Sequence, residues 1–347
     1  MSPASLLLAF FLAAGLAWLA TLIVRKLALK FKILDLPDSP RKIHSQPLPL
    51  LGGWAIFIAL ALTASVLLVW GFIPDNKVSV SLIGGFFAGG LILMLGGWLD
   101  DKYDLSWFQS LFFPVAACLT VIWAGLEVTY ISNPLGGLVY LQDWPYQLPA
   151  ILLFFWLLAM IYTTKLLDGL DGLASSIGLV ASLVIFGVSL FWDDRGSTTT
   201  YLSLALAGSL LGFLIWNWHP AKIFLGESGS TFIGFSLGVL AILTGGKFAT
   251  ALLVMGLPML DVVWTILRRW GSRSKIFSLG DTGHLHFRLL RLGLSQPQVV
   301  IFMSLMALMF GSVSFFTTSQ GKLVALVILT LVMLLLGTVA VLRQKKE

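Results

Sequence analysis

Long apolar segments separated by short polar ones follow one another along the whole chain. Runs of the length that a helix needs to cross a bilayer, about 20 residues, lie at roughly 4–24, 50–70, 80–99, 107–124, 149–167, 172–191, 200–217, 230–245, 248–267, 298–316 and 322–342. The run at 230–245 is the shortest of them. This pattern predicts an all-α polytopic membrane protein with about eleven transmembrane helices.

Basic residues concentrate in alternate connections between these runs. Eleven helices place the two termini on opposite sides of the membrane, and one side holds all but four of the 22 Lys and Arg residues. Because cytoplasmic loops carry the excess of Lys and Arg, that side is predicted to be cytoplasmic, with the N-terminus outside and the C-terminus inside. The expected cytoplasmic loops are about 25–49, 100–106, 165–172, 218–229 and 268–297, and a hairpin is expected on the outer surface at about 125–148.

Composition supports the membrane prediction. The 347 residues are 58% hydrophobic and 11% charged, with a mean hydropathy of +0.95, which is more apolar surface than a water-soluble fold can bury. We therefore expect residues 1–347 to form a single integral membrane domain. The net charge of +6 is explained by the loop asymmetry rather than by nucleic acid, because the pattern leaves no soluble domain to carry a basic patch.

The segment 164–172 places a lysine and two carboxylates at the end of the fifth apolar run. In a helical backbone, Lys165, Asp168 and Asp171 would lie at i, i+3 and i+6 and share one arc of the helix surface. A charged side chain at the centre of a membrane helix costs about 2.5 to 3.5 kcal/mol, so this cluster is expected at an interface or around a wet cavity. The alternative is a charge cluster in which Lys165 merely neutralises one Asp.

Two further acidic sites fall on the same predicted side. Asp100 and Asp101 end the third apolar run, and adjacent carboxylates suggest a bound cation or a shifted pKa. An interfacial cap with Lys102 as the partner is the alternative. Glu227 lies among small residues at a predicted helix start, where backbone N–H groups can receive phosphate oxygens, and a plain N-cap by a neighbouring serine is compatible with this site.

Basic and histidine side chains also lie on the predicted cytoplasmic side. Arg41 and His44 lie in the first cytoplasmic loop, whose basic end could meet an anion, although a loop that only sets the topology explains them equally. His284, His286 and Arg288 lie in the last long loop. They could bind a metal or phosphate, or lie on the membrane surface.

Six motifs, in order along the chain and all on one predicted face, make a combined signature. They are Arg41-Lys42-Ile43-His44 with Leu51-Gly52-Gly53, Leu99-Asp100-Asp101, Leu167-Asp168-Gly169-Leu170-Asp171-Gly172-Leu173-Ala174, Pro220-Ala221-Lys222-Ile223-Phe224-Leu225-Gly226, Pro258-Met259-Leu260-Asp261 and Gly283-His284-Leu285-His286. The chain resembles, over nearly its whole length, the polyprenyl-phosphate N-acetylhexosamine-1-phosphate transferases of glycosyltransferase family 4. The fourth and sixth motifs look more like the branch that uses UDP-N-acetylglucosamine or related sugars than the branch that makes the first peptidoglycan lipid.

The resemblance implies an activity and its partners. An N-acetylhexosamine 1-phosphate, in this branch N-acetylglucosamine 1-phosphate, would pass from a UDP-sugar to undecaprenyl or another polyprenyl phosphate with release of UMP, which initiates envelope glycan synthesis. The site would face the cytoplasm in the bacterial inner membrane and depend on Mg²⁺, with Mn²⁺ as the alternative cation. No nucleic acid is expected as a partner, and a homodimer is an open alternative to a monomer.

The resemblance also implies roles for individual residues. Asp100, Asp101 and Asp171 are the catalytic candidates, and Asp100 or Asp101 would be the base on the acceptor phosphate. Glu227, helped by Asp168 or Asp171, would hold the metal. The substrate-binding candidates are Lys165, Lys222, His284, His286, Arg288, Arg41 and His44.

Several positions depart from the family's pattern. Lys165 and Tyr162 stand where the family has Asn, and Glu227 stands where it has the metal-binding Asp. Leu50 replaces an Arg, and Ser110 replaces a Lys. Glu keeps an oxygen ligand, so a magnesium site remains compatible with the sequence. The lysine lost at 110 and gained at 165 is interpreted as a compensating move of one phosphate-facing charge.

Other functions stay open on the sequence alone. One is an activity like that of the phospho-MurNAc-pentapeptide transferases, and another is a catalytically silent member, suggested by Lys165 and Glu227. The third is an ion-coupled transporter, which should place ionisable groups near the middle of the membrane and show an internal repeat. The sequence has no clear repeat, and only Asp261 lies well inside an apolar segment.

Overall fold

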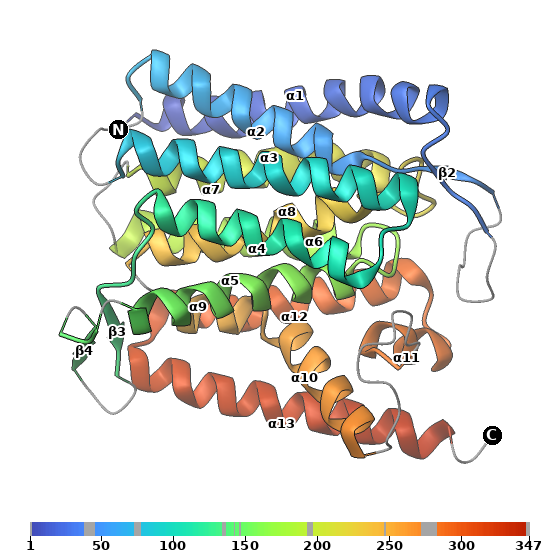
Figure 1. Cartoon of the computed structure of the whole chain (residues 1–347). Coiled ribbons are helices and arrows are strands. Elements are labelled where there is room, and N and C mark those ends of the chain that lie inside the picture. The colour runs from blue at the N-terminus through green and yellow to red at the C-terminus, as the bar shows by residue number, and fades with distance from the viewer. Residues whose placement is uncertain are drawn as a thin grey trace.

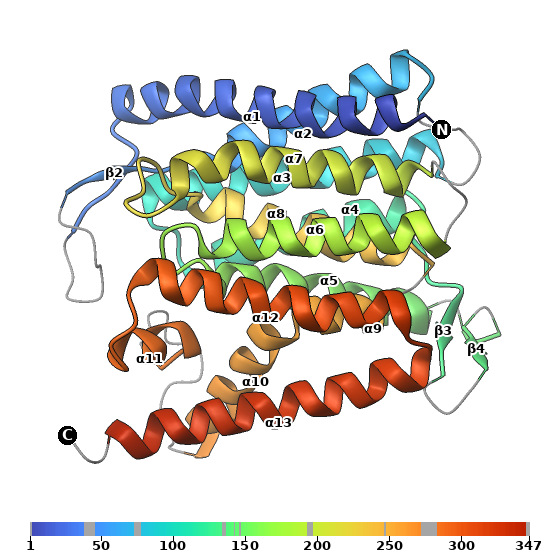
Figure 2. The ribbon, with the colours of Figure 1, turned by 180° about the vertical axis from the view of Figure 1, so that it is seen from behind.

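The chain folds into a bundle of helices, most of which run side by side along one direction (Figures 1 and 2). The computed structural model describes residues 2–37, 46–72, 78–133, 137–141, 143–145, 147–192, 197–245, 248–271 and 283–344. The helices in this part of the chain are α1 (Pro3–Lys30), α2 (Gly52–Val69), α3 (Val80–Tyr103), α4 (Trp107–Trp123), α5 (Gln147–Leu167), α6 (Leu173–Trp192), α7 (Thr198–Asn217), α8 (Gly226–Leu243), α9 (Phe248–Val254), α10 (Gly256–Gly271), α11 (Leu285–Arg291), α12 (Gln296–Phe316) and α13 (Ser319–Gln344).

The apolar runs predict these helices well, with one break. Nine helices of the described ranges are long and apolar enough to cross a membrane, and the all-α polytopic prediction is confirmed. The predicted span at 248–267 is divided into α9 and α10, which meet at 79°. Pro258 lies in the first turn of α10, where its missing N–H is tolerated, whereas in a continuous helix its ring would clash with the preceding turn.

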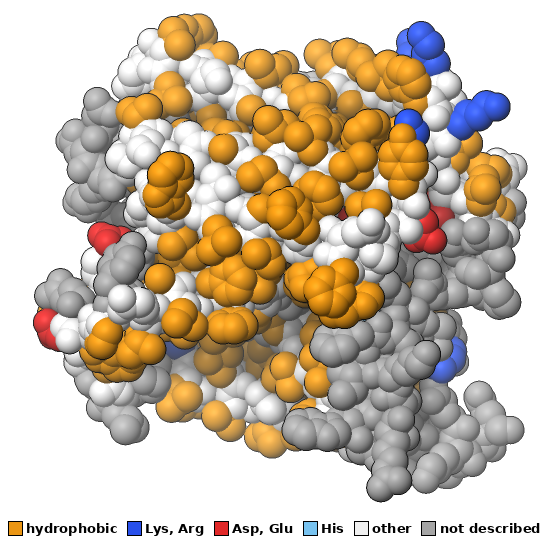
Figure 3. Space-filling model, viewed as in Figure 1, with side chains coloured by type: hydrophobic (Ala, Val, Ile, Leu, Met, Phe, Trp, Pro, Cys, Tyr) orange, Lys and Arg blue, Asp and Glu red, His pale blue; other side chains and the backbone are white. Residues whose placement is uncertain are grey.

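The two ends of the bundle differ. The N-terminus and a hairpin of β3 (Tyr130–Ser132) and β4 (Leu138–Tyr140) lie at one end (Figure 1). The antiparallel pair β1 (Leu34–Asp35) and β2 (Leu48–Pro49), α11 and the C-terminus lie at the other, which we call the C-terminal end. The hairpin predicted within 125–148 is therefore present and lies opposite the C-terminus. Most Lys and Arg side chains visible in Figure 3 lie at the C-terminal end.

Helix α8 lies in the middle of the bundle. It contacts α2, α3, α5 and α6, and nearly all of its residues are buried. A helix that is buried on all sides is typical of the core of a large helical protein. Since α8 starts at the C-terminal end, its first turn is surrounded by the ends of the neighbouring helices.

Glycines let two of these neighbours approach the first turn of α8 closely. A Cβ on Gly53 of α2 would overlap the backbone of Gly229, and a Cβ on Gly97 of α3 would overlap the backbone of Ser228. The amides of Gly52 and Gly53 also donate to the carbonyls of Phe224 and Leu225, at 3.0 and 2.9 Å. The Leu-Gly-Gly motif thus fixes the start of α2 against the start of α8.

Candidate active site

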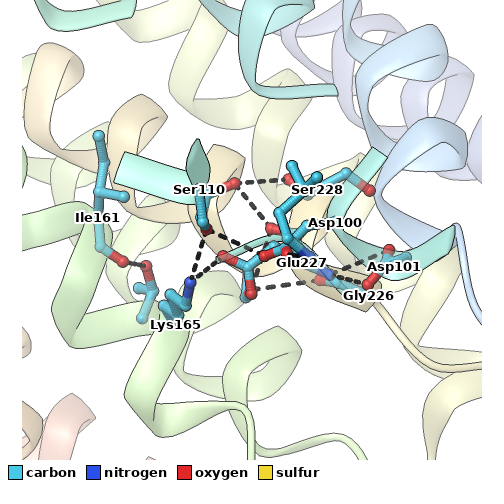
Figure 4. A network of polar contacts seen from close by, with 12 residues as sticks. Asp100, Asp101, Ser110, Ile161, Lys165, Gly226, Glu227 and Ser228 are labelled. Carbon is cyan, nitrogen blue, oxygen red and sulfur yellow. Dashed lines mark hydrogen bonds and ion pairs between the residues drawn. The ribbon is translucent and has the colours of Figure 1, made fainter. Parts of the chain in front are cut away.

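The start of α8 is held by a carboxylate from α3. The backbone N–H of Glu227 donates to Oδ1 and Oδ2 of Asp101, at 3.0 and 3.2 Å, as Figure 4 shows. A carboxylate at a helix N-terminus satisfies an unpaired amide and complements the helix dipole. Asp101, a predicted catalytic residue, therefore also fixes the position of Glu227.

Glu227 in turn forms an ion pair with Lys165 at the end of α5 (Figure 4). The Lys165 ammonium also lies 3.4 Å from the Ser110 Oγ and 5.7 Å from the centre of the Tyr162 ring. The structure thus brings Lys165 next to position 110, as the compensation hypothesis requires. The alternative, in which Lys165 neutralises an Asp of its own segment, was wrong, because its partner belongs to α8.

Asp100 connects the end of α3 to the start of α4. Its Oδ1 accepts from the Leu105 N–H and its Oδ2 accepts from the Ser110 hydroxyl, both at 3.0 Å. The alternative partner, Lys102, lies over the rings of Trp98 and Tyr103 instead. Asp100, Ser110, Lys165 and Glu227 consequently form one continuous polar network.

The predicted arc of Lys165, Asp168 and Asp171 on one helix is wrong. Helix α5 ends at Leu167, and Asp168–Gly172 is an irregular turn in which Gly172 has a φ of 75°. Glycine adopts this left-handed conformation without steric cost. The turn separates the two carboxylates, so that they have different surroundings.

Asp168 is half-buried and makes no hydrogen bond or ion pair with any residue that the structure describes. Burial, together with the neighbouring charges of Glu227, Asp171 and Asp35, raises the pKa of this carboxyl to about 7. Negative charge therefore accumulates around Asp168, which favours a cation there. Asp35, in β1, was not among the predicted site residues, although an acidic residue in a cytoplasmic loop next to a basic motif was a usable signal.

Asp171 faces a different element. Its Oδ2 lies 2.7 Å from His219 Nδ1 and accepts from the Ala221 N–H at 3.1 Å. These contacts attach the 168–172 turn to the segment between α7 and α8. His219 was not predicted as a site residue, and nothing in its local sequence indicates that it would meet a carboxylate from the preceding motif.

The last predicted motifs meet at α11. Asp261 of α10 accepts from the Leu285 N–H and lies against His284 Nδ1, both at 2.8 Å. Asp261, the one carboxylate predicted inside an apolar segment, thus holds the start of α11. The ring of His286 is stacked on His284 with the centres 5.7 Å apart.

His286 connects α11 to the 168–172 turn. A Cβ on Gly169 would lie 2.5 Å from His286 Nε2, and this nitrogen is buried and has no hydrogen-bond partner among the residues that the structure describes. Burial, together with the neighbouring His284, lowers the pKa of His286 to about 3, so the ring is neutral near pH 7. Arg288 is buried, and its Nε donates to the Gly283 carbonyl at 2.7 Å.

The remaining predicted residues are only partly placed. Lys222 is exposed, and its ammonium lies 5.3 Å from the centre of the Trp216 ring. Arg41 and His44 lie outside the described residues.

The carboxylates fit a metal ion that is shared with a substrate. Within the described ranges, no group of three or more His, Cys, Asp or Glu side chains is arranged to hold a metal ion alone. Mg²⁺ is usually bound by one or two carboxylates together with substrate phosphates rather than by a complete protein cage. Asp168, which has no partner among the described residues and whose pKa is raised in part by the charge of Glu227, fits such a site.

Three known proteins that are similar to this chain share one described activity. Residues 83–245 match the sequence profile of "Glycosyl transferase family 4". The probable undecaprenyl-phosphate N-acetylglucosaminyl 1-phosphate transferase of Bacillus subtilis (strain 168) is 30% identical over 315 residues, covering 88% of this chain and 83% of that protein. The decaprenyl-phosphate N-acetylglucosaminephosphotransferase of Mycolicibacterium smegmatis is 34% identical over 346 residues, covering 90% and 83%. The undecaprenyl-phosphate alpha-N-acetylglucosaminyl 1-phosphate transferase of Thermotoga maritima is 31% identical over 274 residues, covering 79% and 78%.

Proposed function

The chain belongs to glycosyl transferase family 4, and we propose that it is a polyprenyl-phosphate N-acetylglucosamine-1-phosphate transferase of the bacterial inner membrane. The donor is a UDP-sugar, the acceptor is a polyprenyl phosphate, and UMP is released on the cytoplasmic side. The observation that carries the proposal is the polar network of Asp100, Ser110, Lys165 and Glu227, which lies beside Asp168 at one end of an apolar bundle. A lipid phosphate and a nucleotide could both reach that end.

In the proposed reaction, an oxygen of the lipid phosphate attacks the sugar-bearing phosphorus of the donor. A new phosphorus–oxygen bond forms, and the bond from this phosphorus to the bridging oxygen of the diphosphate breaks, so that UMP leaves with the bridging oxygen. Catalysis of such a transfer depends on positioning and on stabilisation of the negative charge. Lys165, at the centre of the network, would contact a phosphate oxygen through a charge-assisted hydrogen bond.

The two candidates for the base differ in their hydrogen bonds. Both oxygens of Asp101 already accept the Glu227 N–H, and this carboxylate has the structural task of fixing α8. Asp100 accepts from the Ser110 hydroxyl, which can turn toward a substrate oxygen. This difference supports Asp100 as the group that takes a proton from the acceptor phosphate.

Asp168 and Glu227 would hold Mg²⁺, or Mn²⁺ in its place, and the donor diphosphate would provide the other ligands. When bound, the cation would neutralise the diphosphate and the charge that develops on the leaving UMP. His284, His286 and Arg288 would bind the nucleotide part, with the neutral His286 acting as a hydrogen-bond partner rather than as a charge. Lys222, Arg41 and His44 are proposed to contact phosphate.

The direct test is UMP release by the purified chain in detergent. With Mg²⁺, undecaprenyl phosphate and UDP-N-acetylglucosamine, UMP is expected, and it should require the lipid. A panel of other UDP-sugars, including UDP-MurNAc-pentapeptide, identifies the donor, and Asp104→Asn serves as an exposed acidic control. If no donor in the panel gives UMP, the transferase proposal fails and the silent-member alternative replaces it.

A further inference from the structure

The Lys165–Glu227 ion pair places a fixed positive charge against a carboxylate that we assign to the metal. The side chains are 14% and 19% exposed, so water screens the pair less than it screens a surface pair. Among the residues that the structure describes, Lys165 is the only Lys or Arg paired with a carboxylate of the network. In the structure, therefore, the charge of Glu227 is already neutralised by the protein itself.

Packing between α5 and α8 does not depend on this pair. A Cβ on Gly234 of α8 would overlap Thr164 and the Met160 carbonyl of α5, so the two backbones are in close contact there. Further along, Trp156 Nε1 donates to the Gly238 carbonyl at 3.2 Å. These contacts already hold α5 against α8. Holding the two helices together therefore does not explain why Lys165 and Glu227 are charged.

Two cations cannot share Glu227 favourably. A divalent ion that approaches the carboxylate meets the ammonium of Lys165, which is held nearby by Glu227 and by Ser110. A diphosphate removes this conflict, because its oxygens can receive the ammonium while Glu227 turns to the metal. The flexible stem of lysine allows such a change of partner.

We propose that Lys165 is the internal counter-ion of Glu227 in the free protein, and that a nucleotide diphosphate displaces it, so that divalent metal and nucleotide bind cooperatively. This inference rests on the proposed function, because it takes the metal and the UDP moiety from it. Lys165 is then a positioning residue that makes the metal site available only when the donor is present.

The test measures the binding of Mn²⁺ to the purified full chain in detergent. Electron paramagnetic resonance is the readout, and the titration is done with and without UDP. UDP carries the diphosphate whatever the sugar, and a protein-free titration corrects for Mn²⁺ bound by UDP in solution. UDP is expected to tighten Mn²⁺ binding to the wild type by about ten- to a hundredfold, a usual range for coupled sites. Lys165→Met should bind Mn²⁺ about tenfold more tightly than the wild type without UDP and should lose most of the coupling.

Two variants make the comparison specific. Lys102→Met removes a lysine from the same end of the bundle, where it touches aromatic rings and pairs with no described carboxylate, so it should keep the wild-type coupling. Lys165→Arg keeps the charge and should keep part of the coupling between UDP and Mn²⁺ binding. Thermal melting in detergent checks that each variant is folded, and Lys165→Gln, which also removes the charge, replaces Lys165→Met if the latter does not fold.

Equal Mn²⁺ affinity of the wild type with and without UDP overturns the inference, as does a folded Lys165→Met that binds no more tightly than the wild type. If UMP is released but the Mn²⁺ affinities are uncoupled, the inference fails and the proposed function stands. If no UDP-sugar gives UMP while Lys165→Met tightens Mn²⁺ binding, the role of Lys165 as counter-ion of Glu227 is supported and the proposed function fails.

Discussion

At the scale of single residues, a lysine at position 165 and a lysine placed at position 110 would bring their charge to the same part of the site. The Lys165 ammonium lies 3.4 Å from the Ser110 Oγ, although the two residues belong to different helices. Lys165→Ala should lower kcat/KM about ten- to a hundredfold, because a charged hydrogen bond contributes roughly 1.5 to 3 kcal/mol. Ser110→Lys in that background should restore part of the loss in a UMP-release assay. Failure of the second lysine to raise activity would show that the two positions are not equivalent.

Asp168 and Asp171 belong to one motif but should respond differently to the same change. Asp168→Asn should abolish most turnover and leave thermal stability unchanged, because this side chain has no partner in the described structure. Asp171→Asn should lower stability as well, by about 2–4 °C, because it weakens contacts to His219 and Ala221. UMP release and melting of both variants measure the two effects. Full activity of Asp168→Asn would remove it from the site.

The sequence predicts which residue types gather at the site better than it predicts how they pair. The acidic and histidine motifs were recognisable because charges in apolar segments are costly and need a reason. The partner of Lys165 was not predictable, since Glu227 is distant in the chain and approaches only through the packing of α5 on α8. The expected helical arc failed for a local reason, because the turn after Leu167 ends the helix before Asp168.

At the scale of elements, the fit of α3 against α8 depends on a glycine. A Cβ on Gly97 would overlap the backbone of Ser228, which cannot turn away as a side chain could, whereas a Cβ on Gly84 of the same helix would meet nothing within 4 Å. Gly97→Ala should destabilise the protein by about 1–3 kcal/mol and displace Glu227, with lower UMP release. Gly84→Ala should leave melting and activity unchanged. Equal behaviour of the two variants would contradict the close contact.

Hydropathy predicts where helices lie but not where a continuous apolar run changes direction. The residues from 248 to 267 are apolar throughout the break between α9 and α10, so no polar residue marks it. The break follows from Pro258 and from Gly256, against which Leu329 of α13 packs closely. As a result Asp261, expected inside the membrane, lies against the start of α11 instead, which removes the observation that most favoured a transporter.

At the scale of the whole molecule, the proposed reaction requires the C-terminal end to face the cytoplasm, because charged nucleotide sugars do not cross a bilayer unaided. Cysteine labelling tests this orientation, and it needs exposed positions, which excludes Ser228 at the buried start of α8. Asp104, after α3, and Asp143, after β4, are exposed at opposite ends. The native Cys118 is buried and should contribute little background.

In intact cells, a membrane-impermeant maleimide should label Asp143→Cys at once and should label Asp104→Cys only after the membrane is made permeable. The expected orientation follows from the positive-inside rule, because most of the Lys and Arg side chains visible in Figure 3 lie at the C-terminal end. Asp143→Ser and Asp104→Ser control for labelling elsewhere. If the pattern is reversed, the network around Glu227 faces the outside, where it would meet no UDP-sugar, and the transferase proposal fails even though the fold and the family remain.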